Sequence, residues 1–179
     1  IAENVLNALA YGVPQFRERV FMVGIHKKIY QNEPDALIFK WDKYALFNTE
    51  NVLTRTWPKE REFAPDSSYV FPAKGILKKL TVEYWFHKND VENHPNGNDI
   101  FQVKKGRNKI ATIAEGDTSG KSFKRLHRWR FSPTAAYGHN EVHLHPYKER
   151  RISVAEAMAI QSLPREFAVL PTLPLSKKF

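Results

Sequence analysis

The sequence predicts an α+β fold in which a small, irregular strand-and-loop module is inserted between two pieces of a more regular core. Three observations carry this prediction. The apolar run 20–25 is typical of a strand, and a well-bounded helix is predicted after Ser153. Between them, from about residue 27 to residue 130, no strong periodicity is found, which is uncommon inside a compact domain and favours an inserted module.

The segment before the first predicted strand, residues 11–19, reads Tyr-Gly-Val-Pro-Gln-Phe-Arg-Glu-Arg. A Gly-Val-Pro turn leads into Gln15, Arg17 and Arg19 at alternate positions, and alternate residues of an extended backbone share one face. Arg forks suit phosphate or the edge of a base, and Gln both donates and accepts hydrogen bonds. The alternation predicts a row of donors, with a solvated charge pair as the alternative. The β-branched and aromatic residues that follow predict an inner strand buried on both faces.

Short segments within the module are also expected to be strands, at 36–39, 76–86 and 110–113. In the second of these, Leu80, Val82, Tyr84 and Phe86 alternate with other residues, which favours a strand over a helix. The polar loop 116–122 ends in Gly-Lys-Ser, but three residues separate its glycines where a phosphate-binding P-loop needs four. A nucleotide site is therefore not predicted there.

The clearest helix is predicted at 153–162. Ser153 and Glu156 form the S-x-x-E pattern of a capping box, in which each end satisfies a backbone N–H of the other. Pro164 follows shortly afterwards and provides the stop.

The composition limits the function. The chain has 28 Lys and Arg against 19 Asp and Glu, a formal net charge of +9, which favours an anionic partner. The absence of Cys excludes disulfide bonds, Cys-ligated metals and a thiolate nucleophile within these 179 residues. No apolar segment approaches membrane-spanning length and no signal-peptide pattern opens the chain, so a cytoplasmic protein is expected. Because the chain begins at Ile1 rather than Met, we expect it to be cut from a longer polypeptide.

Cationic residues gather in two clusters that are predicted to bind nucleic acid. Residues 124–130 interleave the aromatic Trp129 with four cations, and a shorter cluster spans 104–107. A solvated face is the alternative for both. The candidate DNA-binding residues are Lys124, Arg125, Arg128, Arg130, Lys105 and Arg107.

Two segments together resemble motifs of the cytosine-5 DNA methyltransferase family. Tyr-Gly-Val-Pro-Gln-x-Arg-x-Arg, followed by an apolar strand, is similar to the family's eighth motif. Residues 145–164 look like the ninth motif, and Arg125-Leu126 and Ser132-Pro133-Thr134 resemble what precedes it. The ninth-motif residues are Arg150, Ser153, Glu156, Gln161 and Pro164.

This resemblance implies a division into three parts. Residues 1–26 would end a Rossmann-like α/β catalytic core, and residues 27–131 would form the target recognition domain. Residues 132–179 would carry the ninth motif back toward the core and stop before the tenth. The chain would then be the carboxy-terminal, DNA-recognising piece of a methyltransferase that acts on double-stranded DNA, with a restriction–modification system as one setting.

The resemblance also implies a reaction. In the family, a Cys thiolate attacks carbon six of a flipped cytosine, and S-adenosylmethionine gives its methyl group to carbon five. Carried over, Arg19 would approach the cytosine O2, with Arg17 and Gln15 supporting the pocket. Because the nucleophilic Cys and the Gly-rich cofactor loop are missing from this sequence, we expect the piece to be inactive alone and to bind no S-adenosylmethionine.

Other interpretations stay open at this point. A stand-alone basic nucleic-acid-binding module without catalysis would account equally well for the charge, and an RNA-directed relative is a further alternative. The spacing of His139, His143 and His145 is a weak metal-site pattern. Glu3, in Glu-Asn-Val, resembles the family's base-binding Glu but lies too close to the eighth motif. A core strand without its partners would expose its edges and apolar faces, which predicts self-association. No membrane partner is expected, because no apolar segment approaches membrane-spanning length.

Overall fold

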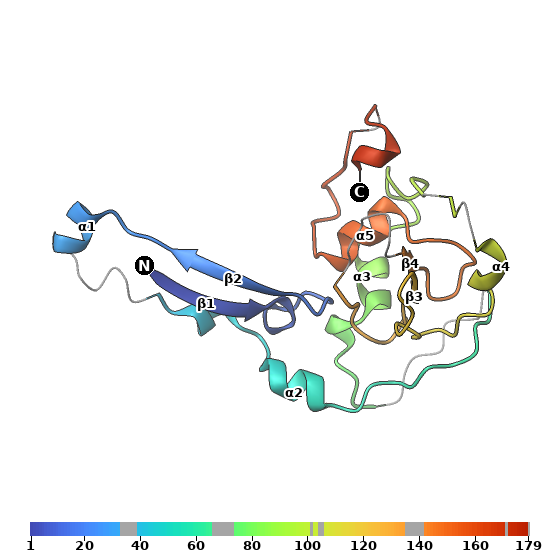
Figure 1. Ribbon diagram of the computed structural model, residues 1–179, viewed down its shortest axis with the longest axis horizontal. Coiled ribbons are helices and arrows are strands. Elements are labelled where there is room, and N and C mark those ends of the chain that lie inside the picture. The colour runs from blue at the N-terminus through green and yellow to red at the C-terminus, as the bar shows by residue number, and fades with distance from the viewer. Residues whose placement is uncertain are drawn as a thin grey trace.

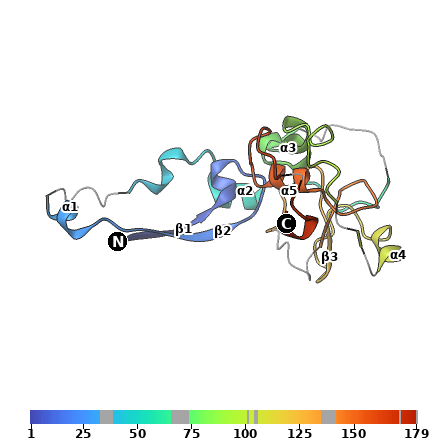
Figure 2. The ribbon, with the colours of Figure 1, turned by 90° about the horizontal axis from the view of Figure 1, so that it is seen from above.

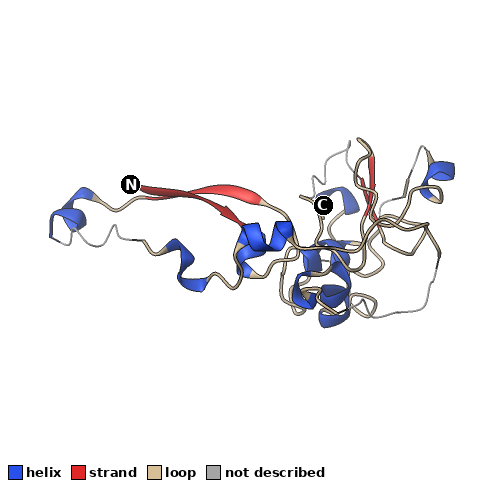
Figure 3. Cartoon of the chain, turned by 90° about the horizontal axis from the view of Figure 1, so that it is seen from below, coloured by secondary structure: helices blue, strands red, loops and turns tan. Residues whose placement is uncertain are grey.

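The protein is a hairpin arm joined to a rounded body (Figures 1 and 2). The computed structural model describes residues 1–32, 39–65, 74–100, 102–103, 106–134, 142–170 and 172–178. Short helices and irregular loops dominate the body, as Figure 3 shows, and the longest strands lie in the arm. The mixed α and β content agrees with the predicted class. None of the helices in these ranges is long and apolar enough to cross a membrane.

Two antiparallel strands form the arm, β1 (Ala2–Asn7) and β2 (Glu18–Val23), with Val5 opposite Val20. A 3₁₀ turn, η1 (Ala8–Tyr11), follows β1 because the Asn7 side chain accepts the Leu9 N–H at 3.0 Å and caps it. Gly12 then ends the turn at φ 83°, a left-handed conformation that favours glycine. The helix α1 (Lys27–Asn32) lies at the tip of the arm.

The prediction of a strand at 20–25 is confirmed, but burial on both faces is wrong for this chain. Among the residues that the structure describes, β2 pairs only with β1 in a two-stranded sheet, and Val20 and Met22 are 64% and 65% exposed. Directly opposed residues share a face, so Val20, Met22 and the exposed Val5 form one apolar surface. The expectation that this strand exposes its apolar side chains is therefore confirmed.

This surface gives the first testable prediction. We expect the 179-residue chain to self-associate at high concentration, because an exposed apolar strand pair invites association with a second copy. The double substitution Val20→Lys and Met22→Lys should restore a monomer in sedimentation velocity. Leu170→Lys, at an exposed apolar residue of the body, is the control and should leave the association unchanged. A wild-type chain that stays monomeric would contradict the prediction.

The body is built from short elements. Two of them, α3 (Val82–Lys88) and α5 (Val154–Ile160), pack against each other at its centre. The parallel pair β3 (Phe123–Arg125) and β4 (Val142–Leu144) lies beside them. The remaining elements are η3 (Trp41–Tyr44), α2 (Thr49–Thr54), η4 (Lys78–Leu80), α4 (Arg107–Ile110) and η5 (Leu175–Lys177).

The strand predicted at 76–86 is instead η4 followed by α3. Thr81 decides this, because its side chain accepts the Tyr84 N–H at 3.3 Å and begins a helix. The alternating apolar residues are buried by tertiary packing, which overrides a weak local preference. Residues 110–113 are also wrong as a strand: Ile110 ends α4 and a turn follows. Of the strand predicted at 36–39, residues 36–38 lie outside the described ranges, and Phe39 is not in a strand.

The helix predicted after Ser153 is confirmed. Ser153 Oγ accepts the Glu156 N–H at 3.2 Å and the Glu156 carboxylate accepts the Ser153 N–H at 2.8 Å, which completes the capping box. All seven residues of α5 are buried. Their core partners include Val82, Phe86 and Leu126 from the part of the chain predicted to be the recognition domain. One hydrophobic core therefore spans the predicted boundary at 131–132, and the three-part division stays a prediction about function.

Candidate functional site

The Gly-Val-Pro turn is pinned to the body by backbone pairing. Gln15 and Ser132 form a parallel bridge, in which Ser132 N–H donates to Pro14 O and Phe16 N–H donates to Ser132 O, both at 2.8 Å. Thr134 Oγ1 donates to Phe16 O at 2.5 Å. The eighth-motif-like segment and the Ser-Pro-Thr segment, more than a hundred residues apart in the sequence, are thus side by side.

Arg17 and Arg19 line one pocket of about 360 Å³ on a face of the arm. Arg19 stands opposite Leu6 in the hairpin, so it shares a face with Leu6 and with Phe21 two residues on. Arg19 is exposed and donates from Nη1 to Glu18 O at 2.6 Å. Arg17 is half-buried, and its guanidinium has no partner among the described residues. The other walls are Leu6, Ala8, Tyr11, Val13 and Phe21.

Apolar and aromatic walls with a few convergent donors are typical of a small-ligand site, and the two guanidinium groups suit a polar base edge or phosphate. The lining contains no carboxylate, thiol, imidazole or amine, and its one hydroxyl, on Tyr11, donates to Trp41 O at 2.9 Å. The pocket can therefore hold and orient a ligand, but it contains no group that attacks one. Tyr11 belongs to the eighth-motif-like segment but was not assigned to the site. Phe21 was not singled out because a single aromatic residue in a strand has no distinctive sequence pattern.

Gln15 does not join the two arginines. Its side chain is fully buried, and within the described residues both Nε2 and Oε1 lack a hydrogen-bond partner. A buried amide without hydrogen-bond partners is costly, so the buried conformation of Gln15 lowers the stability of the fold. The predicted row of three donors is thus right for Arg17 and Arg19 and wrong for Gln15.

The predicted DNA-binding role of Arg125 is corrected by its burial. Its side chain is 0% exposed, and the guanidinium donates to four backbone carbonyl oxygens. It also stacks on the Phe63 ring at 3.7 Å. The four acceptors are Ile110 at 2.6 Å, Ile113 at 2.9 Å, His145 at 2.5 Å and Lys148 at 3.2 Å.

Arg128 is likewise internal and not a surface cation. It is 2% exposed and clamps the buried Glu115, donating from Nε at 2.8 Å and from Nη2 at 2.9 Å. Arg61 Nε approaches the same carboxylate at 2.8 Å. Burial alone would raise the pKa of Glu115, but the hydrogen bonds and charge of Arg128 outweigh it, so the pKa is lowered. This cluster was missed because its members are far apart in the sequence.

The other four candidate cations differ in their accessibility. Lys124 and Arg130 are half-buried, and Arg130 donates to the carbonyl oxygens of Pro58 and Gly116. Arg107 is exposed on α4. Lys105 lies outside the described residues. Of the three that the structure describes, Arg107 is the cation most available to an external partner.

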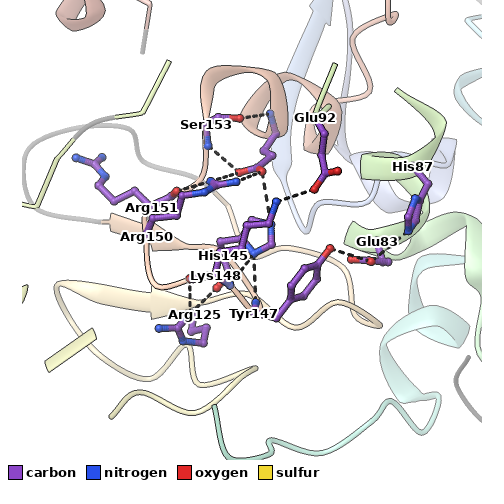
Figure 4. A network of polar contacts seen from close by, with 11 residues as sticks. Glu83, His87, Glu92, Arg125, His145, Tyr147, Lys148, Arg150, Arg151 and Ser153 are labelled. Carbon is purple, nitrogen blue, oxygen red and sulfur yellow. Dashed lines mark hydrogen bonds and ion pairs between the residues drawn. The ribbon is translucent and has the colours of Figure 1, made fainter. Parts of the chain in front are cut away.

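Three of the ninth-motif-like residues, Arg150, Ser153 and Glu156, belong to one polar network at the start of α5 (Figure 4). Arg150 binds the Glu156 carboxylate with both terminal nitrogens, at 2.8 and 2.7 Å, while Glu156 also completes the cap of Ser153. Gln161 caps the other end of the helix and donates from Nε2 to Ala157 O at 3.3 Å. Pro164 is exposed just beyond it. These contacts show that the segment has a structural role, because they orient α5.

His145 belongs to this network. Its Nδ1 accepts the backbone N–H groups of Tyr147 and Lys148 at 3.2 and 3.1 Å, so Nε2 carries the proton and faces Glu156 at 3.5 Å. Burial, together with nearby cations, lowers the pKa of His145 well below its usual value, which keeps the ring neutral. His139 lies outside the described residues, and within those that are described no cluster suits a metal ion.

Known proteins resemble this chain along nearly its whole length. The family model for the C-5 cytosine-specific DNA methylases matches residues 1–177, which include both the Arg17 and Arg19 pocket and the α5 network. The chain therefore belongs to the C-5 cytosine-specific DNA methylase family, as its two motifs predicted.

Among curated proteins, the chain is 49% identical over 178 residues to the Type II methyltransferase M.NmeDI of Neisseria meningitidis serogroup C. This match covers 99% of the chain and 40% of the relative, so the chain spans less than half of that protein's length. Among solved structures, a candidate DNA modification methyltransferase encoded within a prophage (E. coli) matches with a TM-score of 0.45 and 20% identity. That match covers 92% of this chain and 50% of that one.

Proposed function

We propose that this chain is the DNA-recognition part of a cytosine-5 DNA methyltransferase, and that its arm supplies one wall of the pocket for the target cytosine. The observation that carries the proposal is the pocket lined by Arg17 and Arg19, held to the body by the Gln15–Ser132 bridge. Arg19 is assigned to the cytosine O2, and Arg17 to support of the pocket. The buried Gln15 braces the turn between arm and body.

The rest of the reaction is assigned to other parts of the enzyme. No Cys is present in the 179 residues, so the nucleophile and most of the S-adenosylmethionine site would come from elsewhere. We propose that this chain alone transfers no methyl group. Residues 27–131 are proposed as the main reader of double-stranded DNA. The relative's name, a Type II methyltransferase, supports a restriction–modification setting.

A stand-alone nucleic-acid-binding module is not favoured. The family model matches residues 1–177 and includes the arm, which a simple polycation would not need. Two of the cations that made that interpretation attractive, Arg125 and Arg128, are buried.

The proposal is tested by methyl transfer. The 179-residue chain, supplied with S-adenosylmethionine and duplex DNA, should give no transfer above background. In the complete enzyme, Arg19→Ala should lower kcat/KM on the order of a hundredfold, the usual loss when one donor to a reacting group is removed. Arg165→Ala, at an exposed cation of the body, is the matched control. Transfer by the chain alone, or full activity with Arg19→Ala, would overturn the corresponding assignment.

A further inference from the structure

The edge of the body carries a short helix, α4, whose exposed side chains suit base recognition. α4 lies at the end of the body away from the arm (Figure 1). Its Arg107, Asn108 and Lys109 are all exposed, and in the described part of the chain none of the three side chains has a hydrogen bond or ion pair. Arg and Lys pair with guanine, and Asn with adenine, when a protein reads base edges in the major groove.

The helix is short but firmly held. A helix of four residues is not stable by itself, so its position depends on tertiary contacts. Ile110 is buried in the body, 2% exposed. Gly106, at φ 75°, passes under the Phe123 ring so closely that a Cβ there would lie 3.2 Å from a ring carbon. The helix is thus anchored at both of its ends, by Gly106 and Ile110, while the three polar residues between them face solvent.

Arg125 also holds α4 in place. Its guanidinium takes the carbonyl oxygens of Ile110 and Ile113, where α4 ends, and those of His145 and Lys148 before α5. One planar fork therefore fixes α4 relative to the centre of the body. Among the described residues its hydrogen bonds go only to neutral carbonyls, and a buried cation without a bonded carboxylate is costly. The guanidinium offsets this cost by fixing the position of α4 relative to the segment before α5.

We propose that α4 is a base-reading element of the recognition module, in which Asn108 and Lys109 join Arg107 as specificity-determining residues and Arg125 is the positioning residue. This inference rests on the proposed DNA-recognition function. Since α4 is remote from β2, the strand that carries Arg19 (Figure 1), the base pairs that it reads flank the methylated cytosine.

The test measures sequence preference. The 179-residue chain is equilibrated with randomised duplex DNA, and the bound duplexes are sequenced. Asn108→Ala should weaken the preference at one or two positions about tenfold, the value of one good bidentate base contact, without changing affinity for bulk DNA. Arg107→Ala and Lys109→Ala should act on neighbouring positions. Arg125→Lys keeps the charge but loses the fork, and it should weaken the same positions, whereas Arg165→Lys should change nothing.

The outcomes separate the two claims. If the wild-type chain selects a sequence and the three α4 variants select it equally well, the inference fails while the proposed function stands. If the wild-type chain shows no preference, both fail. A merely structural role for Arg125 would lower the folded fraction without changing which positions the folded protein prefers. Should Arg125→Lys not fold, the three exposed variants still decide between the outcomes.

Discussion

Glu115→Ala should lower the free energy of unfolding by about 3 to 5 kcal/mol, the usual cost of removing one partner of a buried ion pair. The carboxylate is 1% exposed and accepts the Arg128 backbone N–H at 2.9 Å in addition to two side-chain bonds. Its loss would remove two side-chain hydrogen bonds and the nearest counter-charge from the buried Arg128 guanidinium. The Arg61 side chain is 42% exposed, so its contact with Glu115 should contribute little of the loss. Urea unfolding followed by circular dichroism measures the change.

Two further variants provide comparisons for the loss of stability in Glu115→Ala. Glu92→Ala removes an ion pair to Lys148 at 2.6 Å in which Glu92 is 70% exposed, and it should cost no more than about 1 kcal/mol. Glu115→Gln keeps the shape and some acceptors, and it should lie between the two. Equal losses for Glu115→Ala and Glu92→Ala would show that the buried cluster does not stabilise the body.

Acidification from about pH 6.5 toward pH 4 should destabilise the body through His127, by on the order of 3 kcal/mol. Burial lowers the pKa of His127 from 6.5 to about 4, with Arg130, Arg61 and Arg128 adding to the effect and Glu115 opposing it. The unfolded chain binds a proton in this window and the folded chain does not, so stability is full above the unfolded pKa and falls as the pH drops. The buried His145 and the lowered pKa of Glu115 act in the same direction.

His127→Asn isolates the contribution of this residue. His127 Nδ1 accepts the Trp129 N–H at 2.9 Å, and an Asn Oδ1 can take over that bond without titrating. The stability of this variant should fall less steeply between pH 6.5 and pH 4 in urea unfolding at a series of pH values. His26→Asn, exposed on the arm, should keep the wild-type profile. If the stability of His127→Asn falls with pH as steeply as that of the wild type, burial of the neutral imidazole is not the cause of the acid destabilisation.

Local signals in the sequence predicted the parts of the structure that local chemistry determines. The capping box of α5 needs only Ser153 and Glu156 three residues apart, so a linear pattern is sufficient to find it. The alternation that placed Arg17 and Arg19 on one face is also local, because a strand has a period of two. Each of these predictions depended on residues within a few positions of one another.

The wrong predictions have one physical cause: segments far away in the sequence determine which side chains are buried. Arg125 and Arg128 stand in a run of cations that resembles a DNA-binding surface, yet carbonyl oxygens and a carboxylate from other segments enclose both. Gln15 fits the alternating pattern but turns inward where the chain meets Ser132. A local sequence pattern does not indicate which distant segment will pack over a given side chain. Direct contact with DNA was therefore assigned to residues that instead hold the body together.

The bridge between Gln15 and Ser132 has a mechanical consequence. It joins the body to the arm at the two peptides that flank Gln15, because Ser132 N–H donates to Pro14 O and Phe16 N–H donates to Ser132 O. A movement of the body relative to the arm would therefore act directly on these two peptides, close to Arg17 in the sequence. The main chain would carry such a movement to Arg17 and Arg19, which line the pocket on the arm.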